Sequence, residues 1–178
     1  LLRSGRISEA RKGIRELAER KLTRPERVEL AGLARRAALP LLGVRLLGSY
    51  VRPGKQVKTD PTAEEKAVYA SCLVKLGAVS EGLALLRELD PSSLPEVLLY
   101  EAFARINEWN YQASIPLLER YVLHDDISDY ERTIGRVNLA AACVHEHQFD
   151  RADPLLEKLR EETRDGKHAR LYGNVFLL

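Results

Sequence analysis

The sequence has no methionine, only two cysteines and little net charge, and each shortage argues against a class of protein. Cys72 and Cys143 lie far apart among apolar residues, whereas a disulfide framework needs more cysteines in a shorter chain. We therefore expect two reduced thiols. The formal net charge of the 178 residues is +2, which creates no overall field towards nucleic acid or an acidic membrane surface.

Long apolar runs and targeting segments are also lacking. No run approaches the ~20 apolar residues that cross a bilayer. The beginning, LLRSGRISEAR, has neither the apolar core nor the cleavage site of a signal peptide. With 45% hydrophobic and 30% charged residues, the composition is typical of a soluble folded protein, and we expect a cytoplasmic location. The absence of an initiator methionine suggests a segment of a longer protein.

The motifs that carry catalysis are missing as well. The chain contains no glycine-rich phosphate loop, no nucleophile elbow and no helix with a clustered Lys/Arg stripe. The sequence therefore predicts no enzyme activity, no cofactor and no direct contact of this segment with nucleic acid.

Two short segments contain residue types that bind metals. In CVHEHQ, Cys143 and His147 are one helical turn apart, a spacing that can hold zinc. However, Cys143 falls on a predicted buried face and no further ligands lie near it in the sequence. HDDISDYE is rich in carboxylates, but helix N-cap residues explain Asp126, Ser128 and Asp129 without calcium. We expect no metal site.

The informative stretch is GAVSEGLALLRELDP, which begins at Gly77. Gly77 suits a turn that needs a positive φ, and Ser80 and Glu81 suit the first turn of a helix. Leucines then recur at three-residue spacing on one helix face. Asp90-Pro91 should end the helix, because proline disfavours helical geometry at the residue before it.

The same template occurs five times. The copies begin at Gly5, Ala38, Gly77, Trp109 and His147, and each has a small residue, then a leucine or isoleucine four positions on, then a large residue three further. In four copies an alanine lies twelve residues before the small residue: Ala31/Gly43, Ala70/Gly82, Ala102/Ser114 and Ala140/Ala152. Each copy therefore predicts a helix pair whose backbones approach closely at two small side chains.

The spacing of these pairs indicates a repeat. Successive small residues, from Ala10 to Ala152, are 33, 39, 32 and 38 residues apart. The repeat is thus about 34 residues long, with extra length in every second connection.

A helix–turn–helix repeat of this length and pattern resembles the tetratricopeptide repeat, although the first helices carry Arg27, Lys66 and Arg136 where that family prefers apolar residues. The resemblance implies an all-α fold: a right-handed α-solenoid of antiparallel helix pairs in a tetratricopeptide-like superhelix. We expect residues 1–178 to form one solenoid fragment. Its predicted divisions are a partial repeat at 1–23, repeats at about 24–62, 63–94, 95–128 and 129–165, and a partial repeat at 166–178.

The resemblance also implies a binding surface, because first helices line the concave groove of such solenoids. The groove positions with chemistry suited to a partner are Arg35, Arg36, Ser71, Lys75, Phe103, Asn107, Asn138 and His145. Arginines bind carboxylates bidentately and amides can hold peptide backbone, so a peptide with acidic groups would fit. The Lys/Asn clamp that some members use for chaperone tails is not expected, since Val28 and Gly32 occupy its first positions.

The expected function is a protein–protein interaction scaffold that holds a peptide or a partner domain. Two alternatives remain open at this level: the sensory or oligomerisation segment of a bacterial transcription regulator, and the regulatory arm of a multidomain enzyme. The last predicted helix carries Val175, Phe176 and Leu177 with no second helix to cover them, so we also expect self-association through this end.

Overall fold

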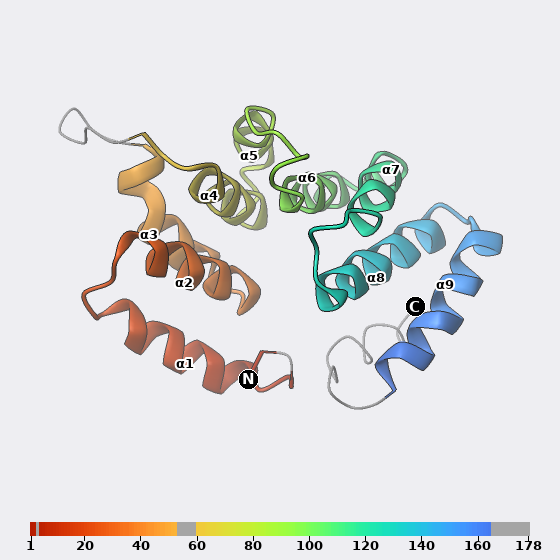
Figure 1. The fold of residues 1–178 in the computed structure, drawn as a ribbon, viewed down its shortest axis with the longest axis horizontal. Helices are drawn as coiled ribbons and strands as arrows, with labels where there is room; N and C mark the ends of the chain where they lie inside the picture. Colours follow the sequence, from red (N-terminus) through yellow and green to blue (C-terminus); the bar gives the residue numbers. More distant parts are fainter. Residues whose placement is uncertain (3, 53–59, 165–178) are drawn as a thin grey trace. The chain divides into compact units, whose positions relative to one another are not determined.

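The structure of the chain is a computed structural model that describes residues 1–2, 4–52 and 60–164. Within these residues the chain forms nine α-helices and no strand (Figure 1), which confirms the predicted all-α class. The helices are α1 (Ile7–Ala18), α2 (Arg24–Arg36), α3 (Pro40–Val51), α4 (Ala63–Lys75), α5 (Val79–Leu86), α6 (Glu96–Asn107), α7 (Tyr111–Val122), α8 (Asp129–His145) and α9 (Phe149–Thr163).

The predicted partial repeat at 166–178, with its proposed self-association, lies outside the described residues. The division of the rest of the chain into repeats stays a prediction.

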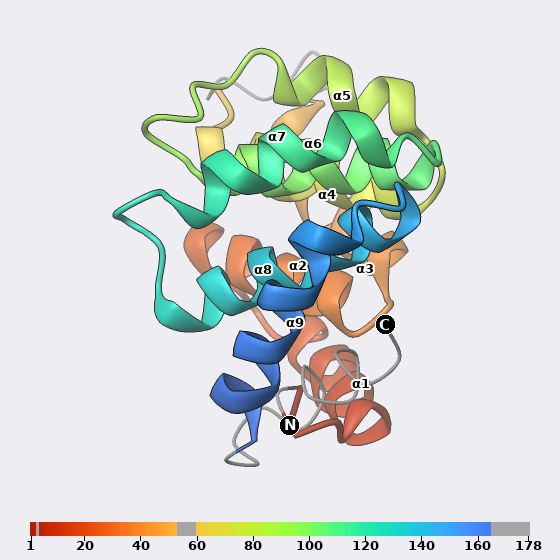
Figure 2. The same cartoon turned by 90° about the vertical axis from the view of Figure 1, so that its right-hand side faces the viewer.

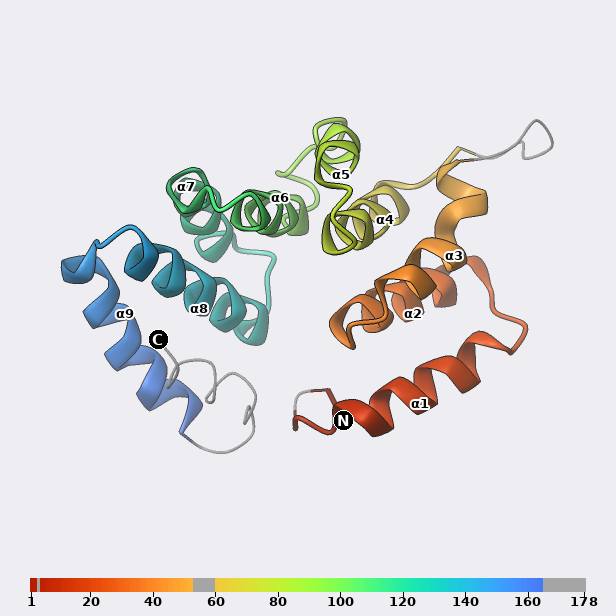
Figure 3. The ribbon, with the colours of Figure 1, turned by 180° about the vertical axis from the view of Figure 1, so that it is seen from behind.

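The chain forms two compact units that divide after Asp90, and we describe each by itself. Unit 1 contains α1–α5 and unit 2 contains α6–α9. In unit 1 each helix packs against the next, and α2 also packs against α4; Figure 3 shows this succession from behind. In unit 2, α6, α7, α8 and α9 likewise pack in chain order (Figure 2).

One turn geometry recurs before five of the helices. The residue two positions before the helix has a left-handed φ: Gly5 (77°) before α1, Ala38 (58°) before α3, Gly77 (88°) before α5, Trp109 (58°) before α7 and His147 (57°) before α9. In four of these turns the next amide donates to the carbonyl five residues earlier: Leu39 to Ala34 (2.8 Å), Ala78 to Leu73 (3.0 Å), Asn110 to Arg105 (2.9 Å) and Gln148 to Cys143 (2.8 Å). This is the hydrogen bond of a Schellman turn, which ends one helix and starts the next. The five residues are those at which the sequence template begins.

The predicted burial of the paired small residues is confirmed, and the close approach is seen in the two pairs that contain a glycine. All eight are buried: Ala31, Gly43, Ala70, Gly82, Ala102, Ser114, Ala140 and Ala152. A Cβ added at Gly43 would stand 3.3 Å from the Ala31 carbonyl oxygen, and one at Gly82 would stand 2.9 Å from that of Ala70. The backbones of the paired helices therefore approach closely at these two glycines, where a larger side chain would not fit.

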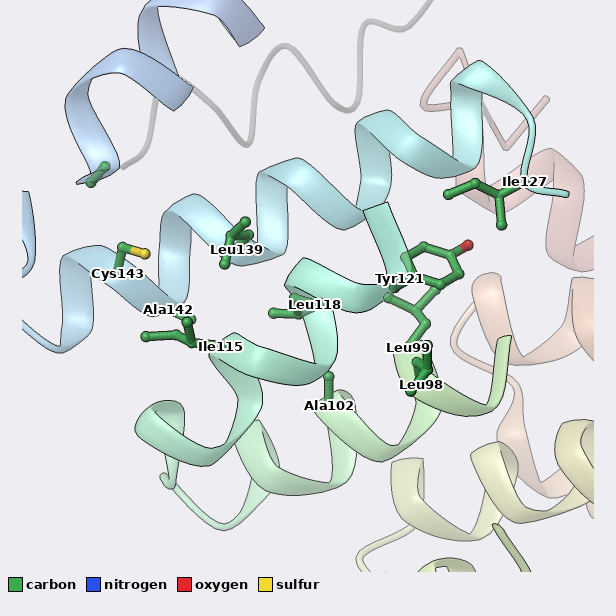
Figure 4. Packing of buried hydrophobic residues seen from close by; sticks show 11 residues of the cluster. Leu98, Leu99, Ala102, Ile115, Leu118, Tyr121, Ile127, Leu139, Ala142 and Cys143 are labelled. Carbon is green, nitrogen blue, oxygen red and sulfur yellow. The ribbon is translucent and has the colours of Figure 1, made fainter. Parts of the chain in front are cut away.

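The core of unit 2 forms around the same contacts. Figure 4 shows Ala102 of α6 facing Leu118 of α7, with Ile115 and Tyr121 on the same helix and Leu139 contributed by α8. These side chains are 0–6% exposed. Unit 1 has an equivalent cluster from α1, α2, α3 and α4: Ile14, Leu30, Ala31, Ala34, Ala37, Leu46, Leu47, Tyr69 and Leu73. Each unit therefore buries its own apolar core.

The helices α2, α4 and α8 begin at a capping box. Thr23 with Glu26, Thr62 with Glu65, and Ser128 with Glu131 each satisfy amides at a helix start. The Ser128 side chain accepts from the amide of Glu131, which confirms its predicted role as an N-cap.

The end of α5 differs from the prediction. The helix ends at Leu86, whereas the Asp90-Pro91 signal predicts an end several residues later. The amides of Glu88 and Leu89 instead donate to carbonyls three residues back, Leu85 and Leu86. Such tighter turns satisfy the last carbonyls of a helix without extending it, and Leu89 is only half-buried.

Candidate interaction surfaces

An ion pair aligns the N-terminal ends of α2 and α4 in unit 1. Arg24 donates from Nε to Glu65 Oε1 (2.5 Å) and from Nη2 to Glu65 Oε2 (2.6 Å). Glu65 is 1% exposed, and these hydrogen bonds from Arg24 hold the pKa of its carboxyl below the usual value. Because the pair joins both N-terminal ends and α2 packs on α4, the C-terminal ends of the two helices lie on the same side of unit 1.

Positive side chains gather at those C-terminal ends. α2 ends with Arg35 and Arg36, and α4 ends with Lys75. At 1.5 Å per residue these lie about 15–18 Å along the helices from the ion pair. Arg11 of α1 reaches the same end of α2, where its Nε donates to the Ala37 carbonyl oxygen (2.7 Å). We call Arg11, Arg35, Arg36 and Lys75 the basic end. The partial negative charge of helix C-termini favours cations there.

The side chains of the basic end differ in exposure. Arg36 and Lys75 are exposed, whereas Arg35 is half-buried. Burial raises the pKa of the Cys72 thiol in α4 to about 11, and the charge of Arg35 partly opposes this rise. Arg35 of α2 therefore lies close enough to α4 for its charge to act on that helix.

Ser71, also predicted to line the groove, is buried, and its hydroxyl donates to the Val68 carbonyl oxygen (2.7 Å). The predicted role of Ser71 in partner binding does not fit this burial.

The four predicted residues of unit 2 have different surroundings. Phe103 is half-buried and packs against the core cluster. Asn138 donates from Nδ2 to the Ile134 carbonyl oxygen of its own helix (2.8 Å). Asn107 and His145 are exposed, at the ends of α6 and α8. Of the four, His145 takes part in a ring contact, with the half-buried Tyr111.

Ring contacts occur at two turns of unit 2. The His145 ring stacks on Tyr111, the first residue of α7, with centroids 4.1 Å apart and planes within 8°. Trp109, in the turn before α7, stands edge-on to Tyr111 at 6.3 Å and 78°. In the turn between α8 and α9, His147 is edge-on to Phe149 at 5.8 Å. The first three rings form one group and the last two form another, and we call the five residues of these two turns the aromatic ridge.

The ridge is open to solvent. Trp109 is 77% exposed and Phe149 is 51% exposed. The two turns are held together by the Gln112 amide, which donates to Glu146 Oε1 (3.1 Å). Exposed aromatic rings on a fixed backbone are typical of contact surfaces, because they bury a large area at small entropic cost.

Neither predicted metal candidate forms a cluster in the described part of the chain. Cys143 is buried, and burial raises the pKa of its thiol, while the His147 ring stands edge-on to Phe149. Among the described residues no group of three metal-ligating side chains is found. The helices of that part are also too short or too polar to cross a membrane.

No family model matches the chain, and no curated protein or solved structure matches it either. The class of protein is therefore defined by its own architecture: an all-α protein of sequentially packed helices.

Two further signals in the sequence indicate these surfaces. Residues 1–90 contain 18 Lys and Arg against 11 Asp and Glu, whereas residues 91–178 contain 10 against 15. The small net charge thus hides a basic first half and an acidic second half. In unit 2 the first residue of the template is an aromatic or histidine residue, Trp109 or His147, and this position lies in an exposed turn.

Proposed function

We propose that this chain is a protein-interaction scaffold, a right-handed α-solenoid of tetratricopeptide-like helix pairs without catalytic activity, which binds a peptide or a partner domain. The observation that carries the proposal is the recurrence of one turn geometry before five helices. A chain that repeats one structural unit builds an extended surface from equivalent helices, and such repeat proteins act mainly by binding.

The basic end of unit 1 is the proposed binding site. Arg36 and Lys75 are exposed on the last turns of two helices that the Arg24–Glu65 pair aligns. Guanidinium and ammonium groups on adjacent helices bind carboxylates through charge-assisted hydrogen bonds. The partner that fits this site is an acidic peptide segment.

The test is the affinity of the chain for a fluorescein-labelled hexaglutamate peptide, measured by anisotropy. The double variant Arg36→Glu/Lys75→Glu should bind at least tenfold more weakly, because reversing two charges replaces attraction by repulsion. The control is Arg20→Glu/Lys21→Glu, which changes the net charge equally at exposed positions between α1 and α2. It should weaken peptide binding less than about threefold.

Equal weakening by both double variants would show diffuse attraction to a basic half and would reject the site. No measurable binding by the unmodified chain would reject an acidic partner. Circular dichroism of each variant checks that the helices are retained.

A further inference from the structure

The aromatic ridge of unit 2 is a second surface whose chemistry is opposite to that of the basic end. Its rings come from two turns that a hydrogen bond joins, so their arrangement is set by the fold and not by a single flexible loop. Trp109 makes a T-shaped contact with Tyr111 and leaves most of its ring surface open. An open indole face is the best aromatic surface for a cation.

The charges around the ridge favour a cationic ligand. The arginines next to it in the sequence are already in ion pairs: Arg105 with Glu101 and Glu108, and Arg151 with Glu119. By contrast, Glu146, between the two histidines of the ridge, contacts a backbone amide and no cation in the described part of the chain. Asp150, which follows Phe149, is exposed on the first turn of α9. The ridge therefore combines open rings with carboxylates that no arginine of the described residues neutralises.

We propose that the aromatic ridge binds an arginine-containing segment of a partner protein, with a guanidinium stacked on Trp109 and its charge balanced by Glu146 and Asp150. Arginine fits better than lysine, because the planar guanidinium stacks on ring faces and is more weakly hydrated than an ammonium. The inference is independent of the proposed acidic partner, since it concerns the other unit and a ligand of opposite charge.

Trp109 is the only tryptophan in the chain, so its fluorescence reports on the ridge directly. Titration with a hexa-arginine peptide should shift the emission to shorter wavelength, protect Trp109 from iodide quenching, and saturate. Hexalysine should bind several-fold more weakly, and hexaglutamate should leave the emission unchanged. A hexaglutamate effect on the basic end is measured separately by anisotropy, so failure of one proposal is distinguishable from failure of the other.

Two double variants separate the ridge from general acidity. Glu146→Gln/Asp150→Asn should weaken hexa-arginine binding about five- to tenfold, while the glutamine keeps the acceptor for the Gln112 amide. The matched control is Asp125→Asn/Asp129→Asn, which removes the same charge from exposed positions, one of them also in the first turn of a helix. It should change the affinity less than twofold.

Four outcomes would overturn the proposal. One is an emission spectrum that hexa-arginine does not change at millimolar concentration. Another is equal weakening by both double variants, which would mean diffuse attraction to an acidic half. The third is an emission shift that depends on the concentration of the chain when no peptide is present, because this would show that a second copy of the chain binds the ridge. The fourth is hexa-arginine binding by Trp109→Ala. This substitution should abolish binding, as measured by calorimetry, and retained binding would overturn the proposal.

Discussion

The backbone contact at Gly82 makes one glycine substitution destabilising in a helix where alanine is normally favoured. In an open helix interior, Gly→Ala stabilises by about 1 kcal/mol. At Gly82 the new Cβ would stand 2.9 Å from the Ala70 carbonyl oxygen and 2.7 Å from Val74 Cγ2. The carbonyl belongs to the backbone of α4, so relief requires α5 to move away from α4.

Overpacking of this kind costs about 1–3 kcal/mol, which outweighs the propensity gain. We expect Gly82→Ala to lower the free energy of unfolding by about 1–2 kcal/mol. The control is Gly32→Ala in α2, where nothing lies within 4 Å of the added Cβ. That substitution should raise the free energy of unfolding by about 0.5–1 kcal/mol.

The measurement is urea denaturation followed by far-ultraviolet circular dichroism, with hydrogen exchange of the α4 and α5 amides to locate the effect. The two substitutions are chemically identical, so opposite signs can arise only from packing. If Gly82→Ala is as stable as the unmodified chain or more stable, the α4–α5 approach is looser than the structure shows, and the close contact between the paired small residues is refuted.

Three further predictions concern ionisation and backbone strain. Glu65→Gln should destabilise the chain at neutral pH. Because Arg24 lowers the folded-state pKa of Glu65, this loss of stability should shrink as the pH falls through that pKa. A loss of stability that does not depend on pH, measured by urea denaturation, would contradict the ion pair. With its pKa at about 11, the buried Cys72 should react with a thiol reagent at pH 8 at least ~100-fold more slowly in the folded chain than in urea. Rapid labelling of the folded chain would instead show that α4 opens. Ala38→Gly should stabilise by about 0.5–1 kcal/mol and Gly77→Ala should destabilise by about 1 kcal/mol, because both positions have left-handed φ; thermal unfolding checks both signs.

Local features of the fold could be read from the sequence because they depend on neighbours along the chain. The left-handed turn at Gly77 and the N-cap at Ser128 depend on a few residues each, and both predictions are confirmed. The close approach of Ala70 and Gly82 was also predictable, since a twelve-residue spacing recurs in four helix pairs. The end of α5 was not, because the strong Asp90-Pro91 signal lies beyond a tighter turn that ends the helix first.

The sequence by itself determined the helical class, the places where paired helices touch and the turns between them, because each leaves a periodic pattern of small and turn-forming residues. Only the tertiary structure decided which side chains are available to a partner. The pairing of Arg24 with Glu65 joins residues 41 positions apart, and the stacking of Tyr111 on His145 joins two different helices. The same holds for Ser71, which the groove pattern marks as accessible and which packing buries. Exposure and ring geometry depend on contacts between helices, and these have no fixed spacing along the chain.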